Sequence, residues 1–262
     1  MDARDDIAFL VGSESREAIL DALATEPRRP TELAKICDCA RETAQRTLAG
    51  FCDRNWVEKH AGKYQLTPGG RMVHEKYGAL VDTVTQVDKA SEFLTNATGQ
   101  IATVPSDVLE QMTITTAIGV DPHAPLNRYL TVLGDEPVED FRGVSPIVSR
   151  VFNEAAERVV GPGTQMELII DSEVLQRSIA SYPDALTRAH ELKQFSLRIS
   201  EEPIDFGLLL VDGHALVAAY DDDDNMVALI DGDDSAVLEW AQSVYDSLRA
   251  NSTAIEPLGP SA

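Results

Sequence analysis

The sequence has no continuous run of apolar residues that approaches the roughly 18 a membrane-spanning helix needs. Its N-terminus also lacks the basic segment followed by an apolar segment that marks a secretory signal. Both absences argue against a membrane partner and against secretion. We therefore expect a soluble, cytoplasmic protein.

The sequence also lacks the short motifs around which many active sites are built. It contains no Gly-rich phosphate-binding loop, no His-x-x-x-His pair and no Gly-x-Ser-x-Gly turn. Acidic runs at 221–224 and 231–234 adjoin expected strands, so solvated turns explain them more simply than a cation site does. The sequence therefore predicts no catalytic residue, no cofactor and no metal site, and it does not predict an enzyme.

Cysteine is scarce, with three residues in the chain: Cys37, Cys39 and Cys52. Two neighbouring cysteines and a distant third, without supporting histidine or carboxylate, form a poor tetrahedral metal site. Small buried or turn cysteines are the simpler interpretation. Metal or redox sensing is the alternative.

Basic residues are few: 22 lysines and arginines stand against 44 aspartates and glutamates, which gives a net charge of −22 and a pI near 4.4. Self-repulsion of this size strains a compact fold at ordinary ionic strength, but the Debye length falls to about 3 Å in 1 M salt. The composition therefore indicates the cytoplasm of an extreme halophile. An ordinary acidic cytosolic protein is the alternative.

The charge is distributed unevenly along the chain. Residues 1–98 hold 13 basic and 16 acidic residues, whereas the remaining residues hold 9 basic and 28 acidic ones. A surface that contacts phosphates cannot be strongly acidic, so the nearly neutral N-terminal part is the part suited to DNA. High salt weakens counterion release, and shape fit and base contacts then have to carry more of the affinity.

The order of elements between residues 6 and 67 is that of a winged helix-turn-helix. Apolar positions at helical spacing predict a first helix that bends at Gly12, a short second helix at 32–37 and then a third helix. The period changes to two over 56–67, with Gly62 in the turn, which predicts a hairpin. Two helices joined by a short turn and followed by a hairpin wing are typical of DNA-reading domains.

The third helix is the element expected to enter the major groove, because the side chains near its start can read bases or hold phosphates. Arginine can form a fork with guanine and glutamine can pair with adenine, while wing residues suit the DNA backbone or the minor groove. A solvated helix face is the alternative, and Glu42 favours it because a carboxylate repels phosphate. The expected DNA-contacting residues are Arg41, Thr43, Gln45 and Arg46 on the helix and Lys59, His60, Lys63 and Tyr64 on the wing.

Two stretches resemble known families. Residues 9–67, with "TELAKICDCARETAQRTLAGFCDRNWVEK" and the wing "HAGKYQLTPGGR", resemble the winged-helix domain of ArsR-like and TrmB-like archaeal transcription regulators. The segment "FRGVSPIVS" at 141–149 is similar to the middle domain of archaeal methanogenesis and filamentation regulators and their haloarchaeal relatives. The first resemblance implies a DNA-binding domain, and the second implies an effector domain without naming the effector.

After the wing, Thr67 and Pro68 can cap and begin a long helix. Apolar residues recur along it at spacings of four and three, the pattern of a heptad seam in a two-stranded coiled coil. A helix packed on its own domain is the alternative, but dimers that bind two half-sites are the common solution for DNA-reading domains of this size. The predicted dimerisation residues are Val73, Tyr77, Leu80, Val84, Val87 and Leu94.

Helices and strands mix after residue 98, which predicts an α/β sensor domain of about 150 residues. Extended segments are expected at 114–119, 129–133, 167–170, 195–199, 206–211, 215–220 and 226–230, and helices at 146–160, 173–192 and 235–249. The expected organisation is a winged helix-turn-helix at 1–66, a linker and dimerisation helix at 67–97, the sensor domain at 98–250 and a disordered tail at 251–262. The predicted fold class is therefore α/β or α+β.

One segment of the sensor domain predicts a ligand site. Ser145 can cap a helix that begins at Pro146, and Arg142 and Gly143 lie just before it, so helix amides and a guanidinium can attract an anion. TrmB-like regulators respond to sugars or their derivatives, and the resemblance therefore implies an anionic metabolite such as a sugar phosphate. A plain helix cap, with Arg142 in a salt bridge, is the alternative.

Together these features predict a dimeric, sequence-specific transcription regulator. Its expected partners are double-stranded DNA, a second copy of the chain and a small-molecule metabolite. The alternative is a winged-helix architectural or protein-interaction module without a ligand.

Overall fold

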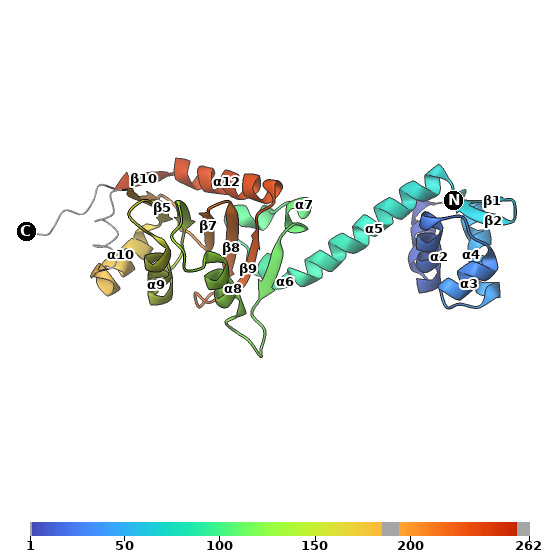
Figure 1. Cartoon of the computed structure of the whole chain (residues 1–262), viewed down its shortest axis with the longest axis horizontal. Helices are drawn as coiled ribbons and strands as arrows, with labels where there is room; N and C mark the ends of the chain where they lie inside the picture. The colour runs from blue at the N-terminus through green and yellow to red at the C-terminus, as the bar shows by residue number, and fades with distance from the viewer. Residues whose placement is uncertain (1, 185–193, 256–262) are drawn as a thin grey trace, which may run out of the picture. The chain divides into compact units, whose positions relative to one another are not determined.

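The computed structural model describes residues 2–184 and 194–255, and the chain divides into two compact units, Met1–Val84 and Thr85–Ala262 (Figure 1). We call them the winged-helix unit and the C-terminal unit and describe each by itself. In the described ranges, no helix is both long enough and apolar enough to cross a membrane.

The winged-helix unit consists of α1 (Ala3–Val11), α2 (Glu14–Thr25), α3 (Pro30–Ile36), α4 (Arg41–Asp53), β1 (Val57–His60) and β2 (Lys63–Leu66). Ile19, Leu48 and Phe51 are fully buried in its core. Buried side chains recur three or four residues apart on α2 and α4, so each helix turns one apolar stripe inward. The predicted winged helix-turn-helix is confirmed, although Gly12 separates two helices rather than bending one.

Left-handed residues lie in two tight turns of this unit, one before α4 and one in the wing. Asp38, with a φ of 46°, lies between α3 and α4, and aspartate tolerates this conformation better than most residues do. In the wing, β1 and β2 pair as antiparallel strands. Ala61 and Gly62 join them with φ values of 51° and 83°, as the type I′ turn of a two-residue hairpin requires.

A close contact fixes the start of α5 (Pro68–Lys89) against the residues that precede the wing. The hydroxyl of Thr67 donates to the carbonyl oxygen of Asn55 at 2.6 Å and accepts from the backbone N–H of Gly70 at 3.0 Å. A Cβ on Gly70 would lie 1.9 Å from the carbonyl oxygen of Trp56. Glycine is therefore required where the helix passes that carbonyl.

We expect Gly70→Ala to destabilise the winged-helix unit by about 1 to 3 kcal/mol, because the added methyl group overpacks the contact with Trp56. Urea unfolding followed by circular dichroism measures this change. Gly78→Ala on the same helix is the matched control: nothing lies within 4 Å of its added Cβ. The control should stabilise the helix by about 0.5 to 1 kcal/mol. Equal effects of the two substitutions would contradict the close contact.

The C-terminal unit is built on one eight-stranded sheet with the strand order β10-β6-β5-β4-β7-β8-β9-β3. Pairing is parallel between β4 and β5 and between β5 and β6, and antiparallel between all other neighbours. The strands are β3 (Thr113–Thr116), β4 (Asp140–Val144), β5 (Gln165–Ile170), β6 (Phe195–Ser200), β7 (Phe206–Val211), β8 (His214–Tyr220), β9 (Met226–Gly232) and β10 (Ser252–Ile255). The helices are α6 (Ser91–Asn96), the 3-10 helix η1 (Gly99–Thr103), α7 (Ser106–Leu109), α8 (Ala124–Leu133), α9 (Arg150–Val159), α10 (Ser172–Ser181) and α12 (Ser235–Ala250).

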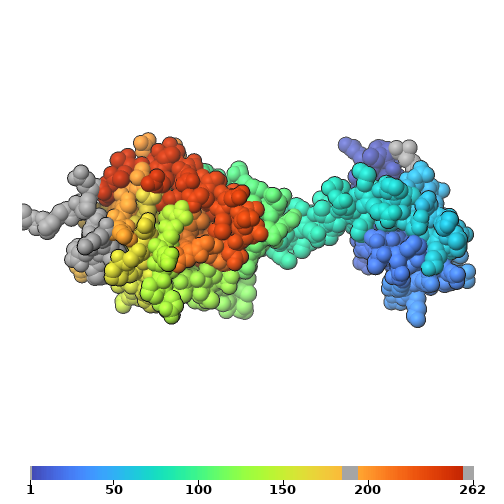
Figure 2. All heavy atoms as spheres, turned by 45° about the horizontal axis from the view of Figure 1, so that its top comes forward, coloured from blue at the N-terminus to red at the C-terminus, as the bar shows by residue number. Residues whose placement is uncertain are grey.

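Helices cover both faces of this sheet (Figure 1). Leu208 and Leu210 pack with α6, α7 and α12 on one face, and Leu209 and Leu216 pack with α8 and α9 on the other. Figure 2 shows the side chains of α12 (red) spread over the first of these faces. Because successive strand residues point to opposite faces, a strand covered on both sides is apolar throughout, as β7 is. The predicted mixed α/β class is confirmed.

Some predicted segments differ from the structure. Residues 129–133, expected as a strand, are the last turns of α8, because their apolar side chains pack on the sheet at helical spacing. The helix expected from 146 begins only at Arg150, after an irregular connection. The helix expected at 173–192 is α10, and residues 185–193 lie outside the described ranges.

The boundaries of the units also differ from the expected ones. The helix expected at 67–97 is divided: α5 ends at Lys89, and Ala90 and Phe93 are buried in the core of the C-terminal unit. The tail expected to be disordered contributes β10, which pairs with β6. Residues 256–262, the rest of that predicted tail, lie outside the described part of the chain.

Candidate nucleic-acid interface and ligand cavity

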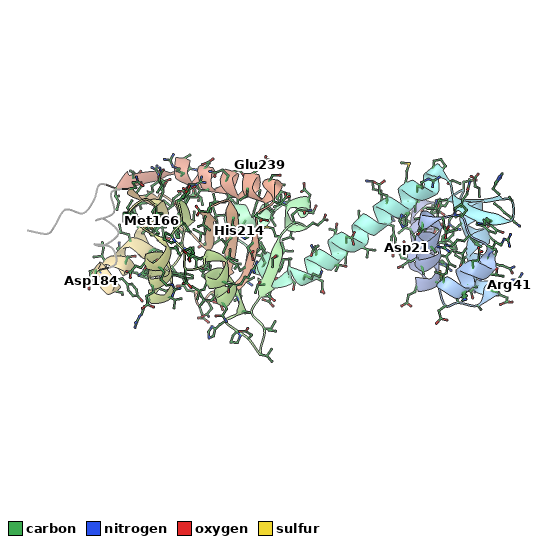
Figure 3. The ribbon with its side chains drawn as sticks, viewed as in Figure 1. Asp21, Arg41, Met166, Asp184, His214 and Glu239 are labelled. Atoms are coloured by element: carbon green, nitrogen blue, oxygen red, sulfur yellow. The ribbon has the colours of Figure 1, made fainter. Side chains whose placement is uncertain are left out.

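The exposed face of α4 carries residues that were predicted to contact DNA. Arg41, Gln45 and Arg46 are exposed, and Thr43 is half-buried at the edge of this face. Figure 3 shows Arg41 at the surface of the winged-helix unit, with its side chain pointing away from the core. Glu42 is exposed on the same face. A helix that enters the major groove must therefore keep Glu42 away from the phosphates.

The wing presents the second group of predicted residues. Lys59, His60 and Lys63 are exposed, and Tyr64 is half-buried. The ammonium group of Lys59 lies 5.5 Å from the ring centroid of Tyr64, its pairing partner on the other strand. This cation–π contact leaves the charge at the surface. The backbone of Tyr64 also bonds that of Arg28, which fixes the wing to the segment before α3.

The cations of the winged-helix unit differ in whether they have acidic partners. Arg54, away from the expected interface, bonds Asp6 at 2.8 Å. Within the ranges that the structure describes, the side chains of Arg41, Arg46 and Lys63 make no ion pair and no hydrogen bond. Acidic residues outnumber basic ones two to one in this chain, so cations left unpaired on α4 and the wing form a surface suited to phosphates.

The three cysteine thiols are free and half-buried. Burial raises the pKa of Cys37 and of Cys52, so both thiols stay protonated and weakly reactive at neutral pH. In the described part of the chain, no three histidine, cysteine, aspartate or glutamate side chains gather as a metal site would need. The geometry offers no support for the alternative of metal or redox sensing at these cysteines.

The two acidic runs behave differently. Residues 221–224 form the exposed β8–β9 turn, in which the Asp221 carboxylate accepts from the backbone of Asp223 and of Asn225 at 3.0 and 2.9 Å; the predicted turn is confirmed. The prediction of a second solvated turn at 231–234 is wrong for its first two residues, because Asp231 and Gly232 are the last residues of β9 and both are buried, Asp231 with 1% of its side chain exposed. Its carboxylate has partners on α8 and β8: Arg128, at 2.9 and 2.7 Å, and His214, at 3.0 Å.

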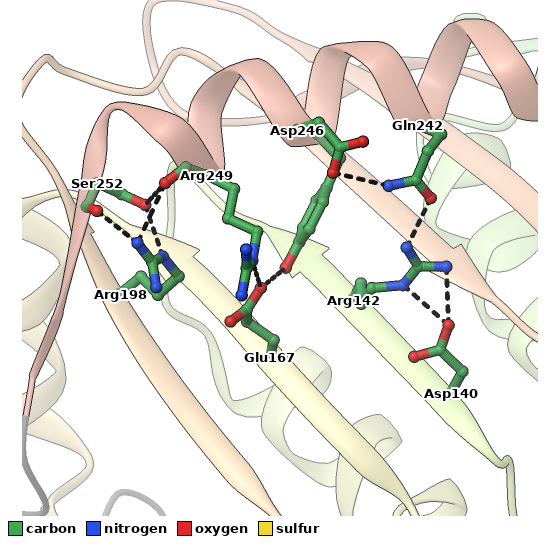
Figure 4. Close-up of polar contacts among 9 residues, drawn as sticks. Asp140, Arg142, Glu167, Arg198, Gln242, Asp246, Arg249 and Ser252 are labelled. Carbon is green, nitrogen blue, oxygen red and sulfur yellow. Dashed lines mark hydrogen bonds and ion pairs between the residues drawn. The ribbon is translucent and has the colours of Figure 1, made fainter.

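Arg142 points toward α12 (Figure 4). Its guanidinium donates to Asp140 at 2.8 Å and to Gln242 of α12 at 2.6 Å. Gly143 and Ser145 instead border the opposite face of the sheet, near α9. Successive residues of a strand alternate between faces, so Arg142 cannot join the other two at one ligand. The predicted set of Arg142, Gly143 and Ser145 is therefore wrong.

Ser145 is not a helix cap. Its hydroxyl donates to the carbonyl oxygen of Ile147 at 2.7 Å. The helix that follows is α9, and its cap is Ser149, whose hydroxyl oxygen accepts from the backbone N–H of Phe152 at 3.3 Å. The serine–proline pair at 145 and 146 thus lies in the connection between β4 and α9.

A second polar group joins α12 to the sheet beside Arg142 (Figure 4). Glu167 accepts from Tyr245 at 2.7 Å and from Arg249 at 2.6 Å. Burial alone would raise the pKa of Glu167, but the hydrogen bonds from Arg249 and Tyr245 outweigh it and hold this pKa below its usual value. The carboxylate is thus ionised and paired, and its contacts serve to dock the helix.

A cavity of about 280 Å³ lies against the other face of the sheet, under α8, α9 and α10. Its wall combines sheet residues such as Gly143 and Leu168 with helix residues such as Tyr129, Phe152 and Ser178. The sequence contains no signal for this cavity as a whole. Its lining is drawn from elements spread between residues 129 and 229, and no local pattern connects them.

Only part of the predicted dimerisation seam is available on α5. Val73 and Tyr77 pack on the core of the winged-helix unit, and burial, together with a hydrogen bond to Glu17, raises the pKa of Tyr77 to about 12. Leu94 belongs to α6 and packs in the C-terminal core. The exposed remainder, which we call the α5 stripe, is Leu80, Val84 and Val87, with exposed fractions of 56%, 60% and 50%.

Two protein-family models match the chain. Residues 122–251 match the middle domain of the methanogenesis regulatory protein FilR1, and residues 4–89 match the HVO_A0261 N-terminal domain. The first match runs from just before α8 to just after α12, and the second covers the winged helix and α5. The C-terminal unit is thus similar to the FilR1 middle domain, and the winged helix with α5 is similar to the HVO_A0261 N-terminal domain. The resemblance to archaeal regulators that the sequence carries is thereby confirmed.

Solved structures match this chain at low similarity. The archaeal chromatin protein TrmBL2 is 14% identical over 92% of this chain and 94% of that chain, with a TM-score of 0.40. The regulator RHA06195 from Rhodococcus sp. RHA1 is 13% identical over 90% and 92%, with a TM-score of 0.26. The S-adenosylmethionine-dependent methyltransferase SibL is 14% identical over 74% and 62%, also with a TM-score of 0.26. Similarity at this level carries no inference about function. A comparison with curated proteins finds no significant match.

Proposed function

We propose that this protein is a dimeric, sequence-specific transcription regulator whose C-terminal unit binds a small-molecule effector. The observation that carries DNA binding is the group of exposed cations on α4 and the wing, which have no acidic partner in the described ranges of a strongly acidic chain. In this proposal α4 enters the major groove and the wing contacts the DNA backbone. In the high salt that suits this composition, base contacts and shape fit supply most of the specific affinity.

The α5 stripe supports the dimer. Leu80, Val84 and Val87 follow one another at intervals of four and three residues and stay exposed, which places them on one side of the helix. A single winged helix reads only a short site. Pairing two copies of α5 would join two winged helices and set the distance between the two half-sites that they contact.

The cavity supports the effector. Ligand pockets typically range from about 300 to 1,000 Å³, and the cavity of about 280 Å³ lies just below that range. An effector that binds the DNA-bound and free forms with different affinity changes operator binding. By linkage, operator DNA then changes effector affinity by the same factor. An architectural winged-helix protein without a ligand would show no such coupling.

The test of DNA binding begins with selection of fragments from a random DNA pool by the full-length protein in high potassium salt. We expect Arg46→Ala to weaken binding to the selected sequence by about 1 to 3 kcal/mol, because a base contact is lost, and to affect random DNA much less. Lys63→Ala should weaken binding to both DNAs alike, because a phosphate contact carries no sequence information. Gel-shift titrations measure all four affinities.

Lys76→Ala is the matched control for these titrations. Lys76 is an exposed cation, 79% accessible, that already pairs with Glu75 on α5. Its removal should leave DNA affinity unchanged. A selection that enriches no sequence, or wild-type affinity in both Arg46→Ala and Lys63→Ala, would overturn the proposed interface.

A further inference from the structure

The cavity under α8, α9 and α10 is larger than the packing of a protein core leaves by chance. Protein interiors contain few voids larger than a water molecule. An apolar cavity of about 150 Å³ is enough to stay dry and to bind benzene. At about 280 Å³, this cavity has nearly twice that volume. Its size suits a bicyclic molecule better than a single ring.

Glycines of the sheet shape the cavity floor. Gly143 on β4 and Gly207 on β7 both line the cavity. A Cβ on Gly143 would lie 2.8 Å from a methyl group of Leu168, and a Cβ on Gly207 would lie 3.2 Å from the hydroxyl oxygen of Tyr220. Any larger residue at these positions would push the wall inward, so the glycines preserve its present shape.

Large apolar side chains of the wall are not fully covered by the protein. Tyr129 of α8, Phe152 of α9 and Tyr220 at the end of β8 line the cavity and are only partly buried. The rings of Tyr129 and Phe152 meet edge to face with centroids 5.1 Å apart. A ring that enters the cavity would cover these surfaces and gain both apolar burial and aromatic contacts.

Among the described residues, few polar groups face the cavity, and none of them is a cation. The described lining contains no lysine, arginine or histidine, and Glu157 is its one carboxylate. Burial raises the pKa of Tyr129 and of Tyr220, so both phenols remain neutral. A phosphate or sulfate group would lose its hydration here without gaining a counter-charge, which is a large cost in apolar surroundings.

One buried donor has no partner. The side-chain nitrogen of Asn153 on α9 is buried, and among the described residues no acceptor lies within hydrogen-bond reach. Asn153 also lines the cavity. A buried donor without an acceptor costs stability, and an oxygen atom of a bound molecule would remove that cost.

We propose that this cavity binds a neutral, mainly apolar ring compound that carries a carbonyl or hydroxyl oxygen, and that Asn153 donates to that oxygen. The ligand class replaces the anionic metabolite that the sequence had led us to expect. As an effector assignment it rests on the proposed function above, but binding itself does not depend on DNA.

Prodan, a neutral naphthyl ketone whose fluorescence shifts to the blue in apolar surroundings, is a direct probe of the cavity. Titration of the full-length protein should show saturable binding of one prodan per chain with a blue shift. Ala156→Leu, which adds a branched side chain to the cavity wall, should lower prodan affinity at least about tenfold, since the added group occupies the volume that the ring needs. Ala180→Leu, on the exposed side of α10, is the matched control and should bind as the wild type does.

Asn153→Ala tests the polar contact, and it decides the question even if Ala156→Leu does not fold. We expect it to lower prodan affinity roughly three- to tenfold, the effect of one neutral hydrogen bond. The affinity for 2-ethylnaphthalene, measured by displacement of prodan, should stay unchanged because this hydrocarbon has no oxygen. A merely structural role of Asn153 would change both affinities or neither.

Three results would overturn the inference: no saturable prodan binding, equal affinity in wild type and Ala156→Leu, or displacement of prodan by glucose 6-phosphate. Specific DNA binding is measured in the same preparation, so that failure of the ligand proposal and failure of the proposed function can be told apart. DNA binding without prodan binding refutes the ligand class and leaves the regulator intact. Prodan binding without specific DNA binding supports the ligand class and refutes the proposed DNA-binding regulator.

Discussion

Replacing both Leu80 and Val84 by aspartate is expected to convert the proposed dimer to monomers and to lower affinity for a two-half-site operator by about a hundredfold or more. The two substitutions put four charges into a paired α5 stripe, where burial without partners costs far more than a short coil gains. A monomer has one winged helix and can contact only one half-site. Each 1.4 kcal/mol of binding free energy that is lost lowers the affinity tenfold. Light scattering measures the mass, and gel-shift titration measures the affinity.

Ala79→Asp is the control for this experiment. Ala79 is exposed on α5 but lies to one side of the stripe, so the new charge stays in water and the dimer should persist. If the Leu80→Asp, Val84→Asp protein remains a dimer, the interface lies elsewhere. If it becomes monomeric with unchanged operator affinity, the proposal that the α5 stripe brings two winged helices together on one operator is refuted.

The heptad pattern shows what the sequence can and cannot predict. It correctly predicts a long helix after the wing, because apolar spacing and the Thr67–Pro68 start are local signals. It cannot tell which surface each apolar residue contacts. Val73 and Tyr77 satisfy the same spacing as the α5 stripe, yet they pack on their own unit. Which surface an apolar position meets is settled by the tertiary fold and not by the spacing.

The C-terminal unit shows the same division between local and non-local information. Strands β7 to β9 are predicted from runs of apolar residues joined by short polar turns, signals that lie within a few residues of each other. The ligand set around Arg142 fails because it relies on sequence neighbours that a strand sends to opposite faces. The cavity that takes its place has walls from distant elements, and it becomes visible only when the sheet is assembled.

Removal of the Asp231 carboxylate is expected to give the largest loss of stability in the C-terminal unit. Asp231 is 1% exposed and accepts two hydrogen bonds from Arg128 and one from His214. Breaking a buried pair typically costs about 3 to 5 kcal/mol, because the remaining charge stays behind without its partner. Arg128 keeps 34% of its side chain exposed, and solvent therefore screens part of its charge. We expect Asp231→Ala to cost about 3 kcal/mol, at the lower end of that range.

Thermal unfolding of the full-length protein in high salt measures this loss, with near-ultraviolet circular dichroism reporting on the C-terminal unit. Asp233→Ala is the matched control, since Asp233 is exposed two residues along the chain and its removal should change stability by less than about 0.5 kcal/mol. Specific DNA binding of Asp231→Ala should survive at temperatures below its transition, because α4 and the wing belong to the other compact unit. A loss smaller than about 1 kcal/mol would mean that water replaces the carboxylate at little cost. The contacts with α8 and β8 would then contribute little to holding this edge of the sheet together.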